Sequence, residues 1–330
     1  MRAVICHKFG SIEDLMLEDV APPPTAADEV RIRVRASGVS FATGLIVSGK
    51  YQRKPPRPFA PGAEVAGEVL EVGVEVTSFQ PGDRVFASVD WGGWAEEAVA
   101  KDFLTHPIPD GLDFATATLL PLSYPTSYAA LVWKARIRKG DWVLVHGSAG
   151  AVGLAAVEIA KSKGANVIAT ASTEEKRTLV SKHGADAAIP YEGFRDAVKH
   201  TTNGHGADIV FDPIGGDIFM ESLRATAREG RLITIGYASG TIPQPPVNFL
   251  LVKNMSILGL NYGTYVGWSP GDDGRSYVSE NRALHADIRA MIEAGHLNPI
   301  ADMRFPLEEF EAAYAAVESR ESVGKVVVEP

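Results

Sequence analysis

The chain has 330 residues and a formal net charge of −9 at pH 7, because 41 Asp and Glu outnumber 32 Lys and Arg. Hydrophobic residues make up 45% of it and charged residues 22%, a profile typical of a globular protein long enough for two domains. The acidic balance argues against nucleic acid as the main partner, since phosphate backbones attract clustered Lys and Arg.

The sequence contains one cysteine, Cys6, so intrachain disulfides and multi-cysteine zinc sites are excluded. No apolar run approaches the roughly 20 residues that a membrane span requires. The first ten residues show a short alternating apolar pattern that is typical of a strand and lack the layout of a signal peptide. We therefore expect a cytoplasmic protein with no membrane partner.

Short strand-like segments dominate the first 120 residues. Apolar and polar positions alternate in "EVRIRVRASGV", and further strand patterns follow with Gly and Pro between them. The predicted strands are 29–39, 63–73, 83–89 and 94–100. This part of the chain is predicted to form an antiparallel, partly barrelled β domain.

The pattern changes near Pro121. A predicted helix over 124–140, ending at Gly140, precedes six apolar strands with helical segments between them. These strands are 142–147, 166–171, 187–190, 208–214, 231–236 and 256–262. Near-continuous apolar strands joined by helices indicate a parallel sheet covered on both faces.

Two helices near 280–295 and 307–319 follow, and the last strand-like segment, 324–330, is assigned to the first domain. The predicted fold class is α/β, with a doubly wound parallel sheet and a mainly antiparallel β domain. The predicted domains are 1–122 with 268–330, and 123–267.

The strongest functional signal is a glycine-rich turn between the strand 142–147 and the helix after it. It follows the dinucleotide fingerprint G-x-G-x-x-G with serine in the first position. In such a turn Gly150 lets the backbone approach a pyrophosphate, Gly153 allows close helix–strand packing, and the helix N-terminus favours negative charge. The predicted cofactor-binding residues here are Ser148, Ala149, Gly150, Ala151, Val152 and Gly153.

The end of the second strand of that sheet selects between NAD and NADP. An NAD site usually places an acidic residue there, but this chain has Ala171 and Ser172. Ser172 and Glu175 fit a capping box, with Ser172 as N-cap, which gives the glutamates a structural role. Without a carboxylate at the strand end, Ser172 and the Lys176 ammonium could bind a 2′-phosphate, with Arg177 as a possible second cation. The alternative is that both cations form a solvated helix face.

Several segments together resemble the zinc-free quinone oxidoreductases (zeta-crystallin-like) of the medium-chain dehydrogenase/reductase superfamily. The likeness extends over essentially the whole chain, through residues 36–51, 58–73, 82–86, 92–99, 147–161, 211–216 and 324–330. It implies a GroES-like catalytic domain, a Rossmann domain and NADPH-dependent reduction. It also implies a homodimer built through the Rossmann sheet edge.

The resemblance further implies that Ser172, Lys176 and Tyr191 surround the 2′-phosphate, and that Gly236 and Tyr237 contact the cofactor. Zinc-dependent relatives carry a cysteine near Ser40 and a histidine at Ala63. Glu64 is retained here without ligand partners, and the four-cysteine structural lobe is absent. The resemblance therefore predicts chemistry without a metal Lewis acid.

Without a Lewis acid, an activated double bond is a more accessible target than an isolated ketone, since its charge spreads into an enolate that hydrogen-bond donors can stabilise. The predicted catalytic residues are Ser40, Thr43 and Tyr51; relatives commonly have Asn and Asp at the first two positions. The predicted function is reduction of quinones or other α,β-unsaturated carbonyl compounds. An enoyl reductase for a small acid or thioester, and a non-catalytic NADPH-binding protein of the crystallin type, are alternatives.

Overall fold

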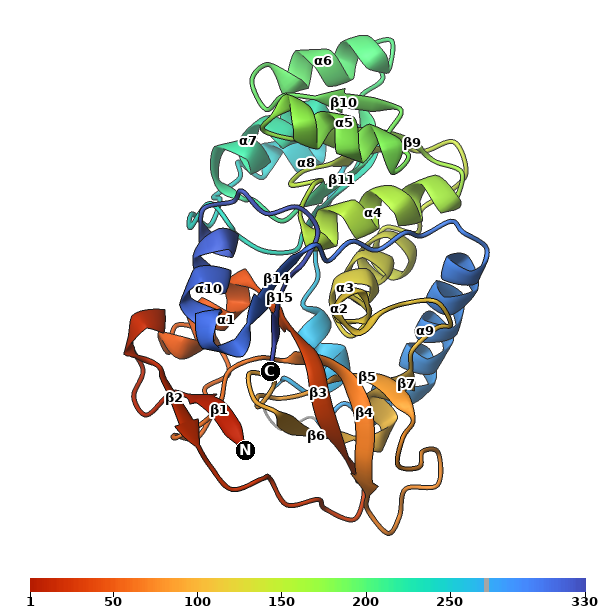
Figure 1. Ribbon diagram of the computed structural model, residues 1–330. Coiled ribbons are helices and arrows are strands. Elements are labelled where there is room, and N and C mark those ends of the chain that lie inside the picture. The colour runs from red at the N-terminus through yellow and green to blue at the C-terminus, as the bar shows by residue number, and fades with distance from the viewer. Residues whose placement is uncertain (270–272) are drawn as a thin grey trace. The chain divides into compact units, whose positions relative to one another are not determined.

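The computed structural model describes residues 1–269 and 273–330, which divide into two compact units (Figure 1). Unit 1 comprises Met1–Leu122, Gly263–Ala286 and Pro299–Pro330, and unit 2 comprises Ser123–Tyr262 and Asp287–Asn298. The sequence pattern assigns residues 287–298 to the first domain, but in the structure they belong to unit 2. In the described part of the chain, no helix is long and apolar enough to cross a membrane.

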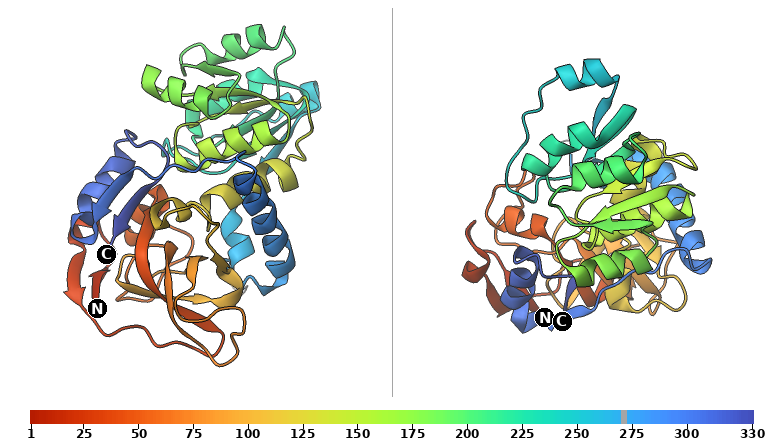
Figure 2. Two further views of the ribbon diagram at one scale, coloured as in Figure 1. Left: turned by 45° about the vertical axis from the view of Figure 1, so that its right-hand side comes forward. Right: turned by 90° about the horizontal axis from the view of Figure 1, so that it is seen from above.

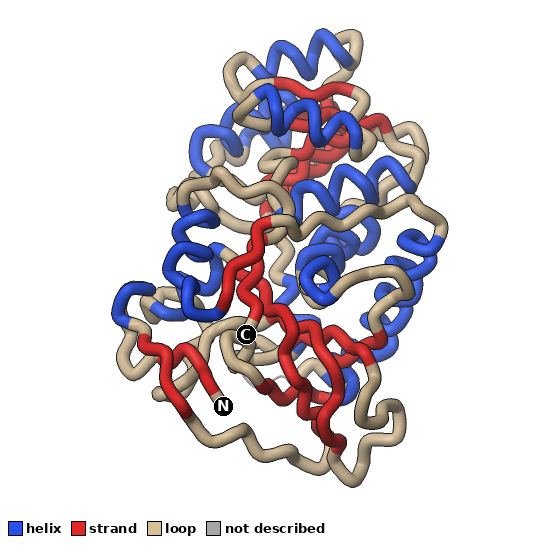
Figure 3. The backbone as a smooth tube through the Cα atoms, in the orientation of Figure 1, coloured by secondary structure: helices blue, strands red, loops and turns tan. Residues whose placement is uncertain are grey.

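Unit 1 is built around a seven-stranded sheet in the order β14-β15-β3-β4-β5-β7, with β6 paired to β3. Figure 3 colours the strands of the chain red. The long strand β3 pairs with β4 along one edge and with β6 and then β15 along the other. Strands β1 and β2 precede β3 in the chain and form a separate two-stranded sheet. The strands are β1 (Arg2–Ile5), β2 (Met16–Asp19), β3 (Glu29–Val39), β4 (Glu64–Val72), β5 (Arg84–Ser88), β6 (Glu97–Lys101), β7 (Thr105–Pro107), β14 (Met303–Pro306) and β15 (Val326–Glu329).

The helices of unit 1 are short, apart from α9, which ends in unit 2. They are α1 (Phe41–Val47), α2 (Phe114–Ala117), α9 (Val278–Glu293) and α10 (Phe310–Glu318), with 3₁₀ turns at Ile12–Asp14, Asp102–Leu104, Tyr262–Val266, Arg275–Tyr277 and Leu307–Glu309. Tyr262 itself belongs to unit 2. The antiparallel character predicted for this part of the chain is confirmed.

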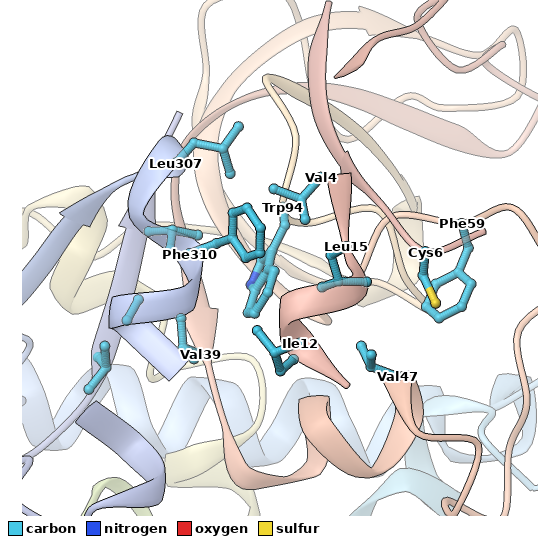
Figure 4. Packing of buried hydrophobic residues seen from close by; sticks show 13 residues of the cluster. Val4, Cys6, Ile12, Leu15, Val39, Val47, Phe59, Trp94, Leu307 and Phe310 are labelled. Carbon is cyan, nitrogen blue, oxygen red and sulfur yellow. The ribbon is translucent and has the colours of Figure 1, made fainter. Parts of the chain in front are cut away.

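One core of unit 1 explains why the C-terminal strand returns to it. Trp94 is fully buried and packs against Phe310 of α10, with ring centroids 6.2 Å apart (Figure 4). Val326 and Val328 of β15 belong to the same cluster, and β15 pairs antiparallel with β3. Burial of its apolar side chains accounts for the place of β15 in unit 1.

Unit 2 contains a six-stranded parallel sheet in the order β10-β9-β8-β11-β12-β13, with helices on both faces (Figure 2). This is the Rossmann order, and all six predicted strands are confirmed. The strands are β8 (Trp142–Val145), β9 (Asn166–Thr170), β10 (Ala187–Ile189), β11 (Ala207–Asp212), β12 (Thr226–Thr234) and β13 (Ser256–Gly259). The helices are α3 (Ser123–Tyr128), α4 (Ala151–Ser162), α5 (Glu174–Lys182), α6 (Phe194–Thr201), α7 (Gly216–Ala225) and α8 (Asn248–Lys253).

The predicted helix over 124–140 is too long. The α-helix α3 continues as a π-helical turn, Ala129–Lys134, and the helical segment stops there. Arg136 adopts a left-handed conformation with φ 52°, which an α-helix does not accommodate. Gly140, the predicted end, lies in the turn before β8. The predicted helix end at Gly140 is therefore wrong. The residue pattern could not show this, because nothing in it marks Arg136 as left-handed.

A buried carboxylate ties the helices of unit 2 together. Glu158 of α4 accepts hydrogen bonds from the Tyr124 hydroxyl and from the Asn298 N–H, at 2.6 and 3.2 Å, and binds His183 Nδ1 at 2.6 Å. Its side chain is almost fully buried. The network therefore holds α3, α4 and the end of α5 to residue 298.

The turn from β8 into α4 depends on two glycines for different reasons. A Cβ at Gly153 would lie 2.1 Å from the Gly147 carbonyl oxygen and 2.8 Å from the Ser148 Cα, both backbone atoms. A Cβ at Gly150 would meet only that carbonyl oxygen, at an ordinary 3.5 Å, and the Gly150 φ is −82°. Among the described residues, packing requires glycine at 153 and not at 150.

We expect Gly153→Ala to lower the free energy of unfolding by about 1–3 kcal/mol or more, because the backbone must shift to admit the methyl group. Gly150→Ala should cost about 1 kcal/mol or less, the difference between glycine and alanine at an N-cap. Urea denaturation of the two variants beside the unmodified protein measures both. Equal losses would show that Gly153 is not the packing constraint described here.

Candidate functional site

The phosphate loop, defined as residues 147–150, lies at the carboxyl end of β8. The Gly150 N–H donates to the Gly147 carbonyl at 3.0 Å, and α4 starts at Ala151 with Gly150 as N-cap. Ala151, Val152 and Gly153 form the first turn of α4, where backbone N–H groups have no partner within the helix. The start of α4, at Ala151, Val152 and Gly153, therefore presents backbone N–H donors and the positive end of a helix dipole, an arrangement that binds phosphate groups.

Ser148 and Ala149 are buried within this loop. The Ser148 hydroxyl donates to the Thr170 carbonyl at 2.8 Å, and its N–H points to the same oxygen at 3.3 Å. The serine that replaces the first glycine of the fingerprint thus fastens the loop to the end of β9. Direct contact of Ser148 with a cofactor stays a prediction.

The turn between β9 and α5 carries the residues predicted to choose the cofactor. Helix α5 begins at Glu174, and its N-cap is Thr173, whose hydroxyl accepts from the Lys176 N–H at 3.3 Å. The predicted capping by Ser172 is wrong, because the helix starts one residue later than the S-x-x-E pattern indicates. Ser172 is exposed, and its side chain is not needed to cap the helix.

Arg177 has a bracing role that the sequence pattern did not reveal. Its guanidinium donates to the Ala171 carbonyl at 3.1 Å and pairs with Glu174 at 2.7 Å, while its side chain is only 20% exposed. The planar, five-donor guanidinium suits this use of several acceptors. Of the two cations on this turn, Arg177 holds the backbone of the strand end, and Lys176 lies in the first turn of α5.

Tyr191, which follows β10, reaches the phosphate loop. Its hydroxyl accepts from the Gly147 N–H at 2.9 Å. The structure thus brings Tyr191 to one end of the loop, while Ser172 and Lys176 lie at the β9–α5 turn. The predicted contacts of these three residues with a 2′-phosphate stay a prediction.

Gly236 and Tyr237 lie in the loop after β12, which packs on the loop after β11. The Ala238 N–H donates to the Pro213 carbonyl at 3.0 Å. A Cβ at Gly215 would lie 2.9 Å from Tyr237 Cδ1, so glycine permits this contact. Both loops follow carboxyl ends of sheet strands, where ligands bind in open α/β sheets.

Asp212, at the end of β11, was not among the predicted site residues. It is fully buried, and its Oδ1 accepts from the N–H groups of Ile214 and Gly215 at 2.7 and 3.0 Å. Burial raises the pKa of this carboxyl above its ordinary value. Asp before Pro-x-Gly-Gly is a turn signature, and this signal could have identified its role in shaping the loop.

In unit 1, the predicted catalytic residues Ser40 and Thr43 meet at the start of α1. Ser40 is the N-cap of α1, and the hydroxyl oxygens of Ser40 and Thr43 are 3.2 Å apart. Thr43 is buried, and Ser40 is partly exposed. The pair forms a reciprocal cap, so each hydroxyl has a structural partner as well as donor capacity.

Tyr51 follows α1 and is the third predicted catalytic residue. Its N–H donates to the Leu45 carbonyl at 3.0 Å, which fixes the backbone after the helix. Burial raises the pKa of its hydroxyl, against a smaller opposing effect of Arg53. Like other tyrosine hydroxyls, it is protonated at neutral pH and is able to donate a hydrogen bond.

Glu64, the acidic residue of the zinc-dependent pattern, has a protein partner. Its carboxylate pairs with the Lys325 ammonium, and both side chains are 4% exposed. A Cβ at Gly38 would lie 2.5 Å from Lys325 Cε and 2.8 Å from Glu64 Oε2, so glycine makes room for the pair. Among the described residues, no group of three or more His, Cys, Asp or Glu is arranged to hold a metal ion.

Comparison with known proteins gives consistent matches over the whole chain. Residues 26–110 match the alcohol dehydrogenase GroES-like domain, and residues 151–272 match the family described as zinc-binding dehydrogenase. The quinone oxidoreductase-like protein 2 homolog of Nematostella vectensis is 40% identical over 332 residues, covering 99% of this chain and 88% of that protein. Human quinone oxidoreductase is 34% identical over 333 residues, covering 99% and 97%.

Solved structures agree with these matches. The quinone oxidoreductase of Thermus thermophilus, described with its NADPH complex, has a TM-score of 0.85 and 34% identity, with 100% of both chains covered. Escherichia coli quinone oxidoreductase complexed with NADPH has a TM-score of 0.88 and 27% identity, again with full coverage of both chains. The GroES-like domain, the Rossmann sheet and these levels of identity together place the chain in the quinone oxidoreductase family of the medium-chain dehydrogenase/reductase superfamily.

Proposed function

We propose that this oxidoreductase uses NADPH to reduce quinones or other α,β-unsaturated carbonyl compounds, without a catalytic zinc ion. The observation that carries the proposal is the phosphate loop at the start of α4. No packing contact among the described residues requires glycine at Gly150, so the glycine leaves space for a ligand's phosphate to approach the backbone. Relatives with this fold are described in complex with NADPH, which supports the cofactor assignment.

The residues of the β9–α5 turn fit NADPH better than NADH. Ala171 and Ser172 follow β9, so no carboxylate stands where an NAD site usually binds the ribose. Ser172 is exposed, and Lys176 brings a positive charge to the first turn of α5. We assign the 2′-phosphate to these two residues and to Tyr191, and assign further cofactor contacts to Gly236 and Tyr237.

NADPH, when bound, supplies a hydride to an electrophilic carbon of the acceptor. As a hydride adds to that carbon, the C=C electrons would form the new double bond of an enolate and the C=O electrons would move onto oxygen; a proton from solvent would complete the reduction. Tyr51 is the proposed hydrogen-bond donor to that oxygen, because a phenol hydroxyl can donate to the developing negative charge. The Ser40 and Thr43 hydroxyls are the proposed additional donors.

The residues present do not fit the zinc site that the dehydrogenase family description implies. Ser40 and Ala63 stand at the positions of the cysteine and histidine ligands. Glu64 is paired with Lys325, whose ammonium already balances the buried carboxylate. No step of the proposed reaction passes through a metal ion.

The proposed homodimer is supported by exposed apolar side chains on α8 and in the segment before it, which precede β13, the strand at one edge of the parallel sheet, in the chain. Ile242, Val247, Leu251 and Val252 are 69, 73, 79 and 69% exposed. Lys253 anchors α8, which carries part of this surface, by donating to the Leu223, Arg224 and Thr226 carbonyls at 2.7–2.9 Å. A second copy pairing at β13 would cover both the edge and these side chains.

The expected cytoplasmic location stays a prediction.

To test the activity, NADPH oxidation is followed with a panel of quinones, enones and a short enoyl thioester, in protein treated with a chelator and then analysed for zinc. We expect turnover with quinones or enones in protein that contains far less than one zinc ion per chain. Turnover confined to the thioester would favour the enoyl reductase. Tight NADPH binding with no turnover on any acceptor would contradict the enzyme assignment, and activity that requires added zinc would contradict the metal-free mechanism.

We expect Lys176→Ala to raise the KM for NADPH about tenfold and to leave the KM for NADH nearly unchanged, since a charge-assisted bond to phosphate is lost. Lys182→Ala, at the other end of α5, is the matched control for the loss of one positive charge. Steady-state kinetics with both cofactors measures the difference. Equal effects on NADPH and NADH would refute the assignment of Lys176 to the 2′-phosphate.

The dimer is tested by sedimentation velocity at micromolar concentration. We expect a dimer, and we expect Leu251→Glu to shift it toward monomer because a charge would be buried at the interface. Val74→Glu is the control, since Val74 is 93% exposed and lies in unit 1. A monomeric unmodified protein, or an L251E variant that remains fully dimeric, would contradict the proposed interface.

A further inference from the structure

A row of polar side chains crosses the parallel sheet just past its apolar centre. Leu144, Ile168, Val210 and Leu232 lie in register on four adjacent strands and belong to one core cluster. Side chains two residues further along a strand point to the same face. At that level lie His146, directly after β8, and the last residues of β9, β11 and β12, which are Thr170, Asp212 and Thr234. This row lies at the carboxyl edge, directly before the loops that form the cofactor site.

His146 connects two sides of the row. Its ring is fully buried, with Nδ1 2.9 Å from the Thr170 hydroxyl and Nε2 2.8 Å from the Ser222 hydroxyl of α7. Ser222 donates its own proton to the Ile218 carbonyl at 2.7 Å, so its oxygen accepts from Nε2–H. Nδ1 is then the acceptor for the Thr170 hydroxyl. Burial lowers the pKa of His146 to about 3, which agrees with one fixed neutral tautomer.

Thr170 faces the phosphate loop through its backbone. Its carbonyl accepts both the hydroxyl and the N–H of Ser148, at 2.8 and 3.3 Å. Its hydroxyl also lies 3.4 Å from the Val145 carbonyl on β8. The neighbouring end of the loop is restrained from the β10 side, since the Gly147 N–H donates to the Tyr191 hydroxyl. Thr170 thus contacts the His146 imidazole through its hydroxyl and Ser148 of the phosphate loop through its carbonyl.

We propose that Thr170 is a positioning residue for the cofactor phosphates. Its carbonyl holds Ser148 of the phosphate loop, and the His146 imidazole in turn holds the Thr170 hydroxyl. The inference rests on the proposed function as a dinucleotide-binding reductase. Lys176 is assigned to the 2′-phosphate, which only NADPH carries. The phosphate loop is proposed to bind the pyrophosphate, which NADPH and NADH share. Loss of the Thr170 hydroxyl should therefore weaken both cofactors alike.

The two hydroxyl partners of His146 provide a matched pair of variants. Thr170→Val removes the donor to Nδ1 and keeps the side-chain volume, while Ser222→Ala removes the acceptor of Nε2–H on α7. Each leaves one imidazole nitrogen unpaired in a buried site, so similar losses of stability are expected. Only Thr170 also contacts the loop, so only its variant should change cofactor affinity. Thr170→Ser retains the hydroxyl and should restore the affinity.

Dissociation constants for NADPH and NADH are measured by fluorescence titration well below the melting temperature of each variant, with thermal unfolding recorded in parallel. We expect Thr170→Val to raise both constants about fivefold, Ser222→Ala to leave them unchanged, and Thr170→Ser to match the unmodified protein. Unchanged constants in T170V, or equal weakening in T170V and S222A, would overturn the proposal. An unmodified protein that binds neither cofactor would instead contradict the proposed function.

Discussion

The proposed cofactor site depends on the close approach of the first turn of α4 to the end of β8. Gly153 lies where a methyl group would overlap the Gly147 carbonyl, so the helix begins directly at the strand end. That approach places the N-terminus of α4 directly after the phosphate loop. The loop is bound to the end of β9 through the hydrogen bond from Ser148 to the Thr170 carbonyl, and to Tyr191, which follows β10, through the Gly147 N–H. Donor groups fixed before a ligand arrives need no costly rearrangement on binding.

The charges of the neighbouring turn are divided between structure and binding. Arg177 is used by the Ala171 carbonyl and by Glu174, and Thr173 caps α5. Ser172 is thereby left exposed at the strand end. A guanidinium bound to a carboxylate adds little net positive charge, and Lys176 stays the cation that is proposed to bind the 2′-phosphate. In unit 1, Lys325 similarly balances Glu64, and the ammonium compensates the charge of that buried carboxylate.

Much of the fold could be predicted because the hydrophobic patterns were long and regular. The six apolar strands of unit 2 and the alternating strand Glu29–Val39 were confirmed, since burial on one or both faces dictates their composition. Boundaries failed where single residues decide. The helix expected to reach Gly140 stops at Lys134 before the left-handed Arg136, and the cap of α5 is Thr173 and not Ser172. Both serine and threonine cap helices well, so the pattern alone could not choose between them.

Local sequence was enough to establish the order of strands and helices, the glycine spacing of the phosphate loop and the lack of a carboxylate directly after β9. The physical causes of these features act over a few neighbouring residues. Tertiary packing selected which polar groups are used internally, including Ser148, Arg177, Glu64 and the His146–Thr170 pair. Most of their partners lie far away in the chain, because buried polar atoms must find hydrogen bonds wherever the fold supplies them.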